Sequence, residues 1–292
     1  MKDFLEYLKN EKRKADNTIL AYRRDLESFE AFLEGRNGRA LADCTESDAM
    51  AYVMELGNNN KSKATINRKI SALRTYCDYN VRKGIRTDNP FNRIKAAKND
   101  KRQIEYLTVD EVKKLLESTD DSVKGLRDRA LMEFMYGTGA RVTEVVRLKY
   151  EDINLRMNFA TIKEYNAESR IVPIGRYAHD ALVEYIDKAY PVITGRAIKP
   201  GDYLFLNQMG KPLTRQGIWK ILKDYGDVIG TADKMTPQVL RDSFAVHILQ
   251  NGGDLKTLQE LMGFDDMSVG IAYLAVTDIH VKEVFTRTHP RA

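Results

Sequence analysis

The spacing of the apolar residues constrains the fold most, because over most of the chain it follows the period of an α-helix. Segments in which apolar residues recur every three or four positions are 18–33, 45–56, 64–76, about 108–148 and the part from about 176 onward. Residues 159–163 and 169–174 favour strands instead, and the polar residues between them favour a turn. The pattern predicts a mainly α-helical chain with one small β-hairpin.

Residues at the ends of these segments indicate where helices begin and end. Asn17 or Thr18 is a suitable N-cap for the helix at 18–33, and Gly35 is a suitable stop. Thr108 and Glu111 have the spacing of a capping box, which predicts the start of another helix.

Composition limits the class of protein. A chain of 292 residues is long enough for two domains with cores of their own. No apolar run approaches the roughly 20 residues that span a membrane, and the N-terminus lacks the apolar core of a secretory signal. Cys44 and Cys77 follow no disulfide or zinc pattern, and no metal-ligand spacing occurs, which disfavours a metal-dependent nuclease. We expect a cytoplasmic protein without a metal or a cofactor.

Positive charge is concentrated in one part of the chain. Residues 61–102 hold 13 Lys or Arg and 3 Asp or Glu, a local net charge of +10, whereas the whole chain has +5. Such a stretch is either a solvated face or a site for a polyanion, and its segregation favours nucleic acid. Its last part is thinly apolar, which is typical of an exposed linker. We therefore expect a domain at 1–93, a linker at 94–104 and a second domain at 105–292.

Arg141 is the first candidate for phosphate chemistry. Gly137 and Gly139 permit a tight entry into a helix, and Glu144 follows one turn later, where it could orient the guanidinium group. A surface Arg–Glu pair is the alternative interpretation.

Arg241 is the second candidate. Thr236 and Pro237 form a strong helix start, and Gln238 and Arg241 then fall one turn apart, near the helix end that attracts anions. Two forked guanidinium groups suit the non-bridging oxygens of a phosphodiester. His247 lies two turns farther on the apolar face, where a hydrogen-bonded core histidine is the better interpretation.

Tyr273 lies ten residues after Gly263, in a short helix with a predicted start at Ser268. A half-buried aromatic residue is the common use of tyrosine in such a helix. Beside two arginines, however, its hydroxyl could attack phosphorus and hold it covalently.

These segments resemble the tyrosine recombinase (phage integrase, Xer-like) family of site-specific DNA recombinases. The motifs that carry the resemblance are Gly-Thr-Gly-Ala-Arg141-Val-Thr-Glu144, Thr236-Pro-Gln238-Val-Leu-Arg241 and Leu-Met-Gly263-Phe264…Tyr273. In the first domain, Thr18…Tyr22…Leu26…Phe29 and Thr65-Ile-Asn67-Arg68…Leu73 are similar to the family as well. The resemblance covers nearly the whole chain. It implies an N-terminal helical core-binding domain and a C-terminal mixed α+β catalytic domain.

The resemblance also implies roles for single residues. Tyr273 would form a 3′-phosphotyrosyl link, Arg141 and Arg241 would stabilise the charge on the phosphate, and a hairpin lysine would protonate the leaving 5′ oxygen. Lys163 is the only lysine in the hairpin proper, although strict register would place Tyr165 there.

Two positions depart from the family pattern. Gln238 stands where histidine is expected, and Phe264 stands where histidine or tryptophan is usual. Because acid–base help is worth about 10²–10⁴-fold, a slow enzyme is expected. The alternatives are a catalytically impaired DNA-binding homologue that acts as a regulator or architectural protein, and a purely structural helical protein.

The partner implied by the resemblance is double-stranded DNA with paired recognition sites, which the enzyme would integrate, excise or resolve. A homo-oligomer, a tetramer on DNA, would form through the C-terminal tail around residues 281–285. The expected DNA contacts are Thr65, Arg68, Lys69 and Arg74 in one helix and Lys95, Lys98, Lys101 and Arg102 in the linker.

Overall fold

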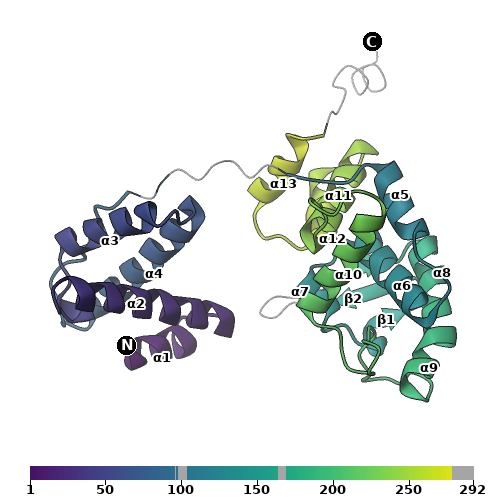
Figure 1. The fold of residues 1–292 in the computed structure, drawn as a ribbon, viewed down its shortest axis with the longest axis horizontal. Helices are drawn as coiled ribbons and strands as arrows, with labels where there is room; N and C mark the ends of the chain where they lie inside the picture. The colour runs from purple at the N-terminus through teal and green to yellow at the C-terminus, as the bar shows by residue number, and fades with distance from the viewer. Residues whose placement is uncertain (96, 98–103, 164–168, 278–292) are drawn as a thin grey trace, which may run out of the picture. The chain divides into compact units, whose positions relative to one another are not determined.

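The computed structural model describes residues 1–95, 97, 104–163 and 169–277. The chain divides into two compact units, Met1–Arg102 and Gln103–Ala292, and each is described by itself (Figure 1). As predicted, the fold is mainly helical with one small sheet. Among the described residues, no helix has both the length and the apolar character needed to cross a bilayer.

In its described residues, the first unit consists of four α-helices and a short 3₁₀ turn. The elements are α1 (Lys2–Asn10), α2 (Asp16–Arg36), η1 (Leu41–Asp43), α3 (Glu46–Asn58) and α4 (Lys63–Arg82). Three of them confirm the helices predicted from periodicity. The ends of α2 differ from the prediction, because Ala15 is its N-cap and Gly35 lies inside its last turn.

The core of the first unit is aromatic and holds a buried carboxylate. Phe29 packs against Tyr52 and Phe91 with ring centroids 4.9 Å and 5.4 Å apart. Asp25 of α2 is 1% exposed and pairs with Arg68 and with Lys69 of α4. A buried charge is tolerated only when it is paired, so these two cations stabilise the contact between α2 and α4.

The second unit begins with the predicted capping box. Thr108 accepts a hydrogen bond from the Glu111 amide at 3.2 Å, and the Glu111 carboxylate accepts one from the Thr108 amide at 2.7 Å. The helices that follow are α5 (Val109–Glu117), α6 (Val123–Thr138) and α7 (Val142–Val145). Helix α6 is buried on most of its surface and packs against α8 and α11, so it is the central helix of this unit (Figure 1).

The predicted hairpin is confirmed, and the sheet gains a third strand. The three antiparallel strands, in the order β1-β2-β3, are β1 (Ile153–Asn154), β2 (Phe159–Ile162) and β3 (Arg170–Pro173). In this register Ile162 lies opposite Arg170. Strand β1 has only two residues, too few to show the alternation by which strands are recognised in a sequence.

The helices after the sheet complete the described part of the second unit. They are α8 (Arg176–Glu184), η3 (Tyr185–Ala189), α9 (Tyr190–Thr194), α10 (Arg215–Val228), α11 (Pro237–Gln250), α12 (Leu255–Met262) and α13 (Met267–Leu274). Thr236 caps α11 by accepting a hydrogen bond from the Val239 amide at 3.1 Å, as predicted. The prediction for α13 was wrong by a residue, because the helix begins at Met267 and Asp266 is its cap.

His247 on α11 is a core residue, as interpreted from the sequence. It is 6% exposed, and its Nδ1 atom shares a hydrogen bond with the Tyr136 hydroxyl of α6 at 2.9 Å. Burial lowers the pKa of the imidazole, so the neutral ring is favoured.

Glu133 on α6 gives the second unit a pH-dependent stability. Burial raises the pKa of its carboxyl to about 7, although Arg129 opposes the shift. The folded protein therefore holds this proton more tightly than the unfolded chain does. The resulting stability is present below the ordinary pKa near 4.5 and is lost as the pH rises to about 7.

We expect Glu133→Gln to raise the free energy of unfolding at pH 8 by about 1–2 kcal/mol and to change it little at pH 5. Denaturant titrations at both pH values measure the difference. The exposed Glu117 on α5 provides the matched Glu117→Gln control, for which no such pH dependence is expected.

Candidate active site

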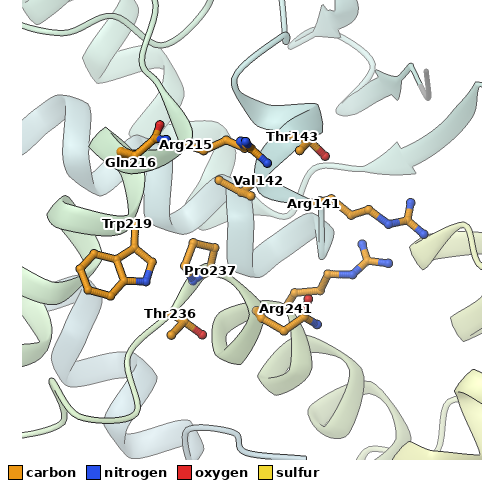
Figure 2. A pocket seen from close by; sticks show the side chains of 10 residues that line it. Arg141, Val142, Thr143, Arg215, Gln216, Trp219, Thr236, Pro237 and Arg241 are labelled. Atoms are coloured by element: carbon orange, nitrogen blue, oxygen red, sulfur yellow. The ribbon is translucent and has the colours of Figure 1, made fainter. Parts of the chain in front are cut away.

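Arg141 and Arg241 line one cavity of the second unit. The cavity has a volume of about 540 Å³, and the starts of α7, α10 and α11 surround it. Its lining residues are Arg141, Val142, Thr143, Arg215, Gln216, Trp219, Thr236, Pro237, Gln238 and Arg241. Figure 2 shows the side chains of Arg141 and Arg241 running side by side with their guanidinium groups at the same end. Two cations from segments a hundred residues apart therefore line the same cavity.

Arg241 is held deep in the site by backbone carbonyl groups. Its side chain donates hydrogen bonds to the carbonyl oxygens of Gly139 and of Met262, the latter at 2.7 Å. Burial, together with the neighbouring charge of Arg141, lowers the pKa of the guanidinium to about 10. At neutral pH the group is still a cation, and its 6% exposure means that little water screens its charge.

Gly139 makes room for this arrangement. It ends α6 with a φ of +60°, and a Cβ atom there would lie 2.5 Å from the Phe244 ring. A side chain at this position is excluded by both the backbone conformation and the contact. The glycine thus lets the chain turn so that its carbonyl meets Arg241 and the next residues carry Arg141 into the cavity.

Arg141 is more accessible than Arg241. Its side chain is 35% exposed, it pairs with Glu144 at 2.9 Å, and it donates to the carbonyl oxygen of Gly263. The i,i+3 contact with Glu144 confirms the orientation expected from the sequence. Gly263 ends α12 in the left-handed conformation, with a φ of +61°, which aims its carbonyl at Arg141.

Arg170 is a third arginine of this cluster that the sequence reasoning did not single out. Its guanidinium group donates two hydrogen bonds of 2.8 Å to the two carboxylate oxygens of Glu144 and a third to the carbonyl of Leu261. Burial alone would raise the pKa of Glu144, but Arg170 and Arg141 outweigh it and lower that pKa. The alternation of β3, in which Arg170 shares a face with the buried Val172, was the signal that could have identified it.

We expect Arg170→Met to lower the free energy of unfolding by about 2 kcal/mol, because Glu144 loses its bidentate partner and keeps only Arg141. Cleavage activity should fall as well, since Arg141 is oriented by Glu144. Chemical denaturation measures the first effect. Arg156→Met, in the exposed turn between β1 and β2, is the matched control, and an equal loss there would contradict the role of Arg170.

Tyr273 lies in the same cluster but faces a carboxylate. The side chain is 3% exposed, and its hydroxyl donates a hydrogen bond of 2.6 Å to Oδ1 of Asp242. The phenol is close enough to Arg241 to act on the pKa of that guanidinium, yet Tyr273 is not among the residues that line the cavity. The structure thus brings the tyrosine to the arginines and holds its oxygen beside the cavity, on Asp242.

The two atypical positions have distinct environments. Gln238 is exposed, lines the cavity and donates a hydrogen bond of 2.8 Å from Nε2 to the same Oδ1 of Asp242. Phe264 is 7% exposed and belongs to the apolar cluster that surrounds Tyr273. A Cβ atom at Gly270 would lie 3.1 Å from the Phe264 ring, so the ring packs tightly on α13.

Lys163 is bound to Asp152. Its ammonium group pairs with that carboxylate at 2.5 Å, and the side chain is 60% exposed. Asp152 raises the pKa of the lysine. Lys163 follows the last residue of β2, and Tyr165, the alternative by register, lies outside the described residues.

The expected DNA contacts in the first unit have two different environments. Lys69 is 9% exposed and bound to Asp25 and Tyr52, and Arg74 donates to the carbonyl groups of Phe91 and Ile94. Those two cations hold the unit together. Arg68 and Lys95 are exposed, and Thr65 is partly exposed at the start of α4. Lys98, Lys101 and Arg102 lie outside the described residues.

Family comparisons match both units. Residues 105–280 match the phage integrase family, and residues 1–84 match the phage integrase N-terminal SAM-like domain. A putative tyrosine recombinase of Caldanaerobacter subterraneus subsp. tengcongensis is 41% identical over 99% of this chain and 98% of its own length. The tyrosine recombinase XerD of Listeria innocua is 38% identical over 99% of this chain and 98% of its own length.

Solved structures have the same fold. The XerA recombinase is 25% identical, with a TM-score of 0.56 over 99% of this chain and 98% of that one. The Tn1549 transposon integrase in complex with transposon right end DNA is 18% identical, with a TM-score of 0.77 over 98% of both chains.

Proposed function

Because the chain belongs to the phage integrase family, we infer that it is a tyrosine-type site-specific DNA recombinase, which cleaves and rejoins strands through a 3′-phosphotyrosyl intermediate. The observation that carries the residue assignments is the meeting of Arg141 and Arg241 at one cavity, with Tyr273 packed beside Arg241. A phosphodiester is the substrate group that two adjacent forked cations fit best.

In the proposed reaction, the Tyr273 oxygen attacks the scissile phosphorus, and the bond to the 5′ oxygen breaks. Arg141 and Arg241 bind the non-bridging oxygens and stabilise the charge that develops there. Lys163 is the proposed acid that protonates the leaving oxygen, which requires it to exchange Asp152 for the substrate. The phosphotyrosyl ester keeps the bond energy, so a 5′ hydroxyl of a partner strand can reseal the DNA without a nucleotide cofactor.

Attack also requires a local rearrangement. The Tyr273 hydroxyl is buried and bound to Oδ1 of Asp242, and Gln238, which lines the cavity, is bound to the same oxygen. Phosphorus and phenol therefore meet only when Gln238 or α13 moves.

The DNA duplex is proposed to contact both units. Arg68, Lys95 and Thr65 are the contacts proposed in the described part of the first unit, and Lys98, Lys101 and Arg102 extend them. Lys69 and Arg74 act indirectly in this proposal, because they are bound within the unit and are less exposed than Arg68, which also pairs with Asp25. A tetramer on paired sites, assembled through the tail after residue 277, completes the proposal for strand exchange.

We expect affinity for duplex DNA to fall about a thousandfold between 50 and 200 mM salt, the loss that corresponds to roughly six phosphate contacts. Lys95→Gln should reduce the slope of log affinity against log salt by about one. Lys188→Gln, on η3 where Lys188 pairs with Glu184, is the control and should leave the slope unchanged. A shallow salt dependence of the parent protein would argue against the proposed DNA contacts.

A nicked suicide duplex tests the function directly. After cleavage, the short fragment that carries the free 5′ hydroxyl diffuses away, so the 3′-phosphotyrosyl link cannot be resealed. A covalent protein–DNA product should therefore form without added metal or nucleotide and survive denaturation. Salt-sensitive binding without any trapped product would contradict the recombinase assignment and leave a DNA-binding homologue.

A further inference from the structure

One carboxylate oxygen joins the nucleophile to the cavity wall. Oδ1 of Asp242 accepts hydrogen bonds from the Tyr273 hydroxyl at 2.6 Å and from the Gln238 amide at 2.8 Å. Asp242 and Tyr273 are 1% and 3% exposed. An O–H···O distance of 2.6 Å is typical of a hydroxyl that donates to an ionised acceptor.

We propose that Asp242 is a catalytic residue that removes the proton of Tyr273 as the phenol attacks phosphorus; this rests on the proposed role of Tyr273 as nucleophile. A phenol has an ordinary pKa of about 10 and is almost entirely protonated at neutral pH, so a base is needed. Gln238, at the position where the family has histidine, cannot accept a proton in that way. Asp242 already holds the hydrogen bond along which the proton would move.

The proton and the bonds balance in both directions. During cleavage the O–H proton of Tyr273 passes to Oδ1 of Asp242, the phenolic oxygen bonds to phosphorus, and the bond from phosphorus to the 5′ oxygen breaks. The 5′ oxygen takes its proton from the general acid. During rejoining a 5′ hydroxyl attacks phosphorus and loses its proton to the conjugate base of that acid. The bond from phosphorus to the phenolic oxygen breaks, and the released phenolate recovers its proton from Asp242.

Gln238 is a positioning residue in this proposal. Its amide lies four residues before Asp242 on the same face of α11 and fixes Oδ1 beside Tyr273. An amide donates at every pH between 5 and 9, so this orientation does not titrate. Because Gln238 is exposed and lines the cavity, it holds Oδ1 in place before the phosphate enters, and its side chain then swings away to admit the phosphate while Tyr273 stays on Asp242.

Arg241 attracts the negative charge that forms on the Tyr273 oxygen. The phenolic charge of Tyr273 raises the pKa of Arg241, so the phenolate and the guanidinium stabilise each other. Three other charged groups, Arg141, Glu144 and Arg170, act on Arg241. Tyr136 of α6 and His247 of α11 are hydrogen-bonded to each other. Lys256 and Glu260 of α12 are exposed.

The test compares single-turnover cleavage of the suicide duplex by the parent protein, Asp242→Asn and Asp242→Glu between pH 6 and 9. Asparagine is isosteric and can still accept a hydrogen bond from the phenol, but it takes no proton. We expect Asp242→Asn to lower the rate about 10²–10⁴-fold at neutral pH. Its rate should climb about tenfold per pH unit, because hydroxide must then remove the proton. Asp242→Glu should keep the level pH profile of the parent.

Two chemical substitutions separate a base from a structural carboxylate. Trifluorotyrosine at position 273 has a more acidic phenol and should restore much of the rate of Asp242→Asn. A substrate with sulfur in place of the bridging 5′ oxygen needs no acid, so it should rescue a Lys163→Ala variant and leave Asp242→Asn slow. Rescue of Asp242→Asn by the sulfur substrate alone would overturn the assignment.

The outcomes distinguish this inference from the proposed function. Absence of trapped product with the parent protein would overturn both. Trapping by the parent with an unchanged rate and pH profile in Asp242→Asn would overturn only the role of Asp242. Thermal melting checks that each variant is folded. If Asp242→Asn does not fold, Asp242→Glu provides the test. An Asp242→Glu protein that is folded, inactive and unresponsive to trifluorotyrosine would overturn the role of Asp242.

Discussion

Tyr273→Phe should abolish covalent trapping of a nicked suicide duplex and leave DNA affinity unchanged. The substitution removes a single oxygen, which is the atom proposed to bond to phosphorus, and keeps the ring that packs in the apolar cluster with Phe264. The proposal assigns the attack on phosphorus to this oxygen alone, so the expected loss is total and not partial. Denaturing electrophoresis of labelled DNA measures trapping, and a binding assay measures affinity.

Tyr225 provides a matched control for that experiment. It lies on α10, and its buried hydroxyl also donates to a carboxylate, Oδ2 of Asp128, at 3.2 Å. Tyr225→Phe therefore removes a comparable hydrogen bond away from the two arginines and should retain trapping. If Tyr273→Phe still formed the covalent product, the nucleophile assignment would be wrong.

Arg241→Lys should lower the cleavage rate about 10²–10³-fold, the range observed when one preorganised donor to a developing oxyanion is removed. Lysine keeps a positive charge but lacks the forked guanidinium group. That group can donate to the Gly139 and Met262 carbonyls and face the cavity at the same time. Single-turnover cleavage at saturating enzyme measures the effect on the chemical step apart from binding.

A loss of folding must be separated from a loss of chemistry here, because Arg241 is buried. Arg127 on α6 is a suitable control, since it is also buried and donates to a backbone carbonyl, that of Leu206, at 3.1 Å. Arg127→Lys should lower thermal stability to a similar degree and leave cleavage by the folded protein intact. A normal cleavage rate in folded Arg241→Lys would remove Arg241 from the mechanism.

Local sequence patterns predicted much of the framework. The helical period located α2, α3, α4 and α11, and alternation located β2 and β3, because side-chain direction in each element is fixed by its own geometry. The pairing of Arg141 with Glu144 followed from the same logic of helical neighbours.

Contacts between distant segments were beyond such patterns. The spacing placed Tyr273 on a helix but could not show that Asp242, 31 residues earlier, accepts its hydrogen bond. Asp242 directly follows Arg241 and interrupts an apolar stretch of α11, which was a usable signal for a functional carboxylate. The sequence pattern placed Lys69 and Arg74 among the surface cations. The structure shows that Lys69 pairs with Asp25 of α2 and that Arg74 donates to the carbonyl group of Phe91.

The carbonyl bonds of Arg141 and Arg241 have a consequence for how this enzyme can change. The hydrogen bonds of these cations connect the turn at Gly139 to the end of α12 at Met262 and Gly263. The groups proposed to bind the substrate therefore also hold distant segments of the chain together. Selection for a sturdier scaffold and selection for faster turnover therefore act on the same atoms. Laboratory evolution of a new target preference should succeed mainly at positions outside this set of hydrogen bonds, where a substitution alters DNA contacts without destabilising the fold.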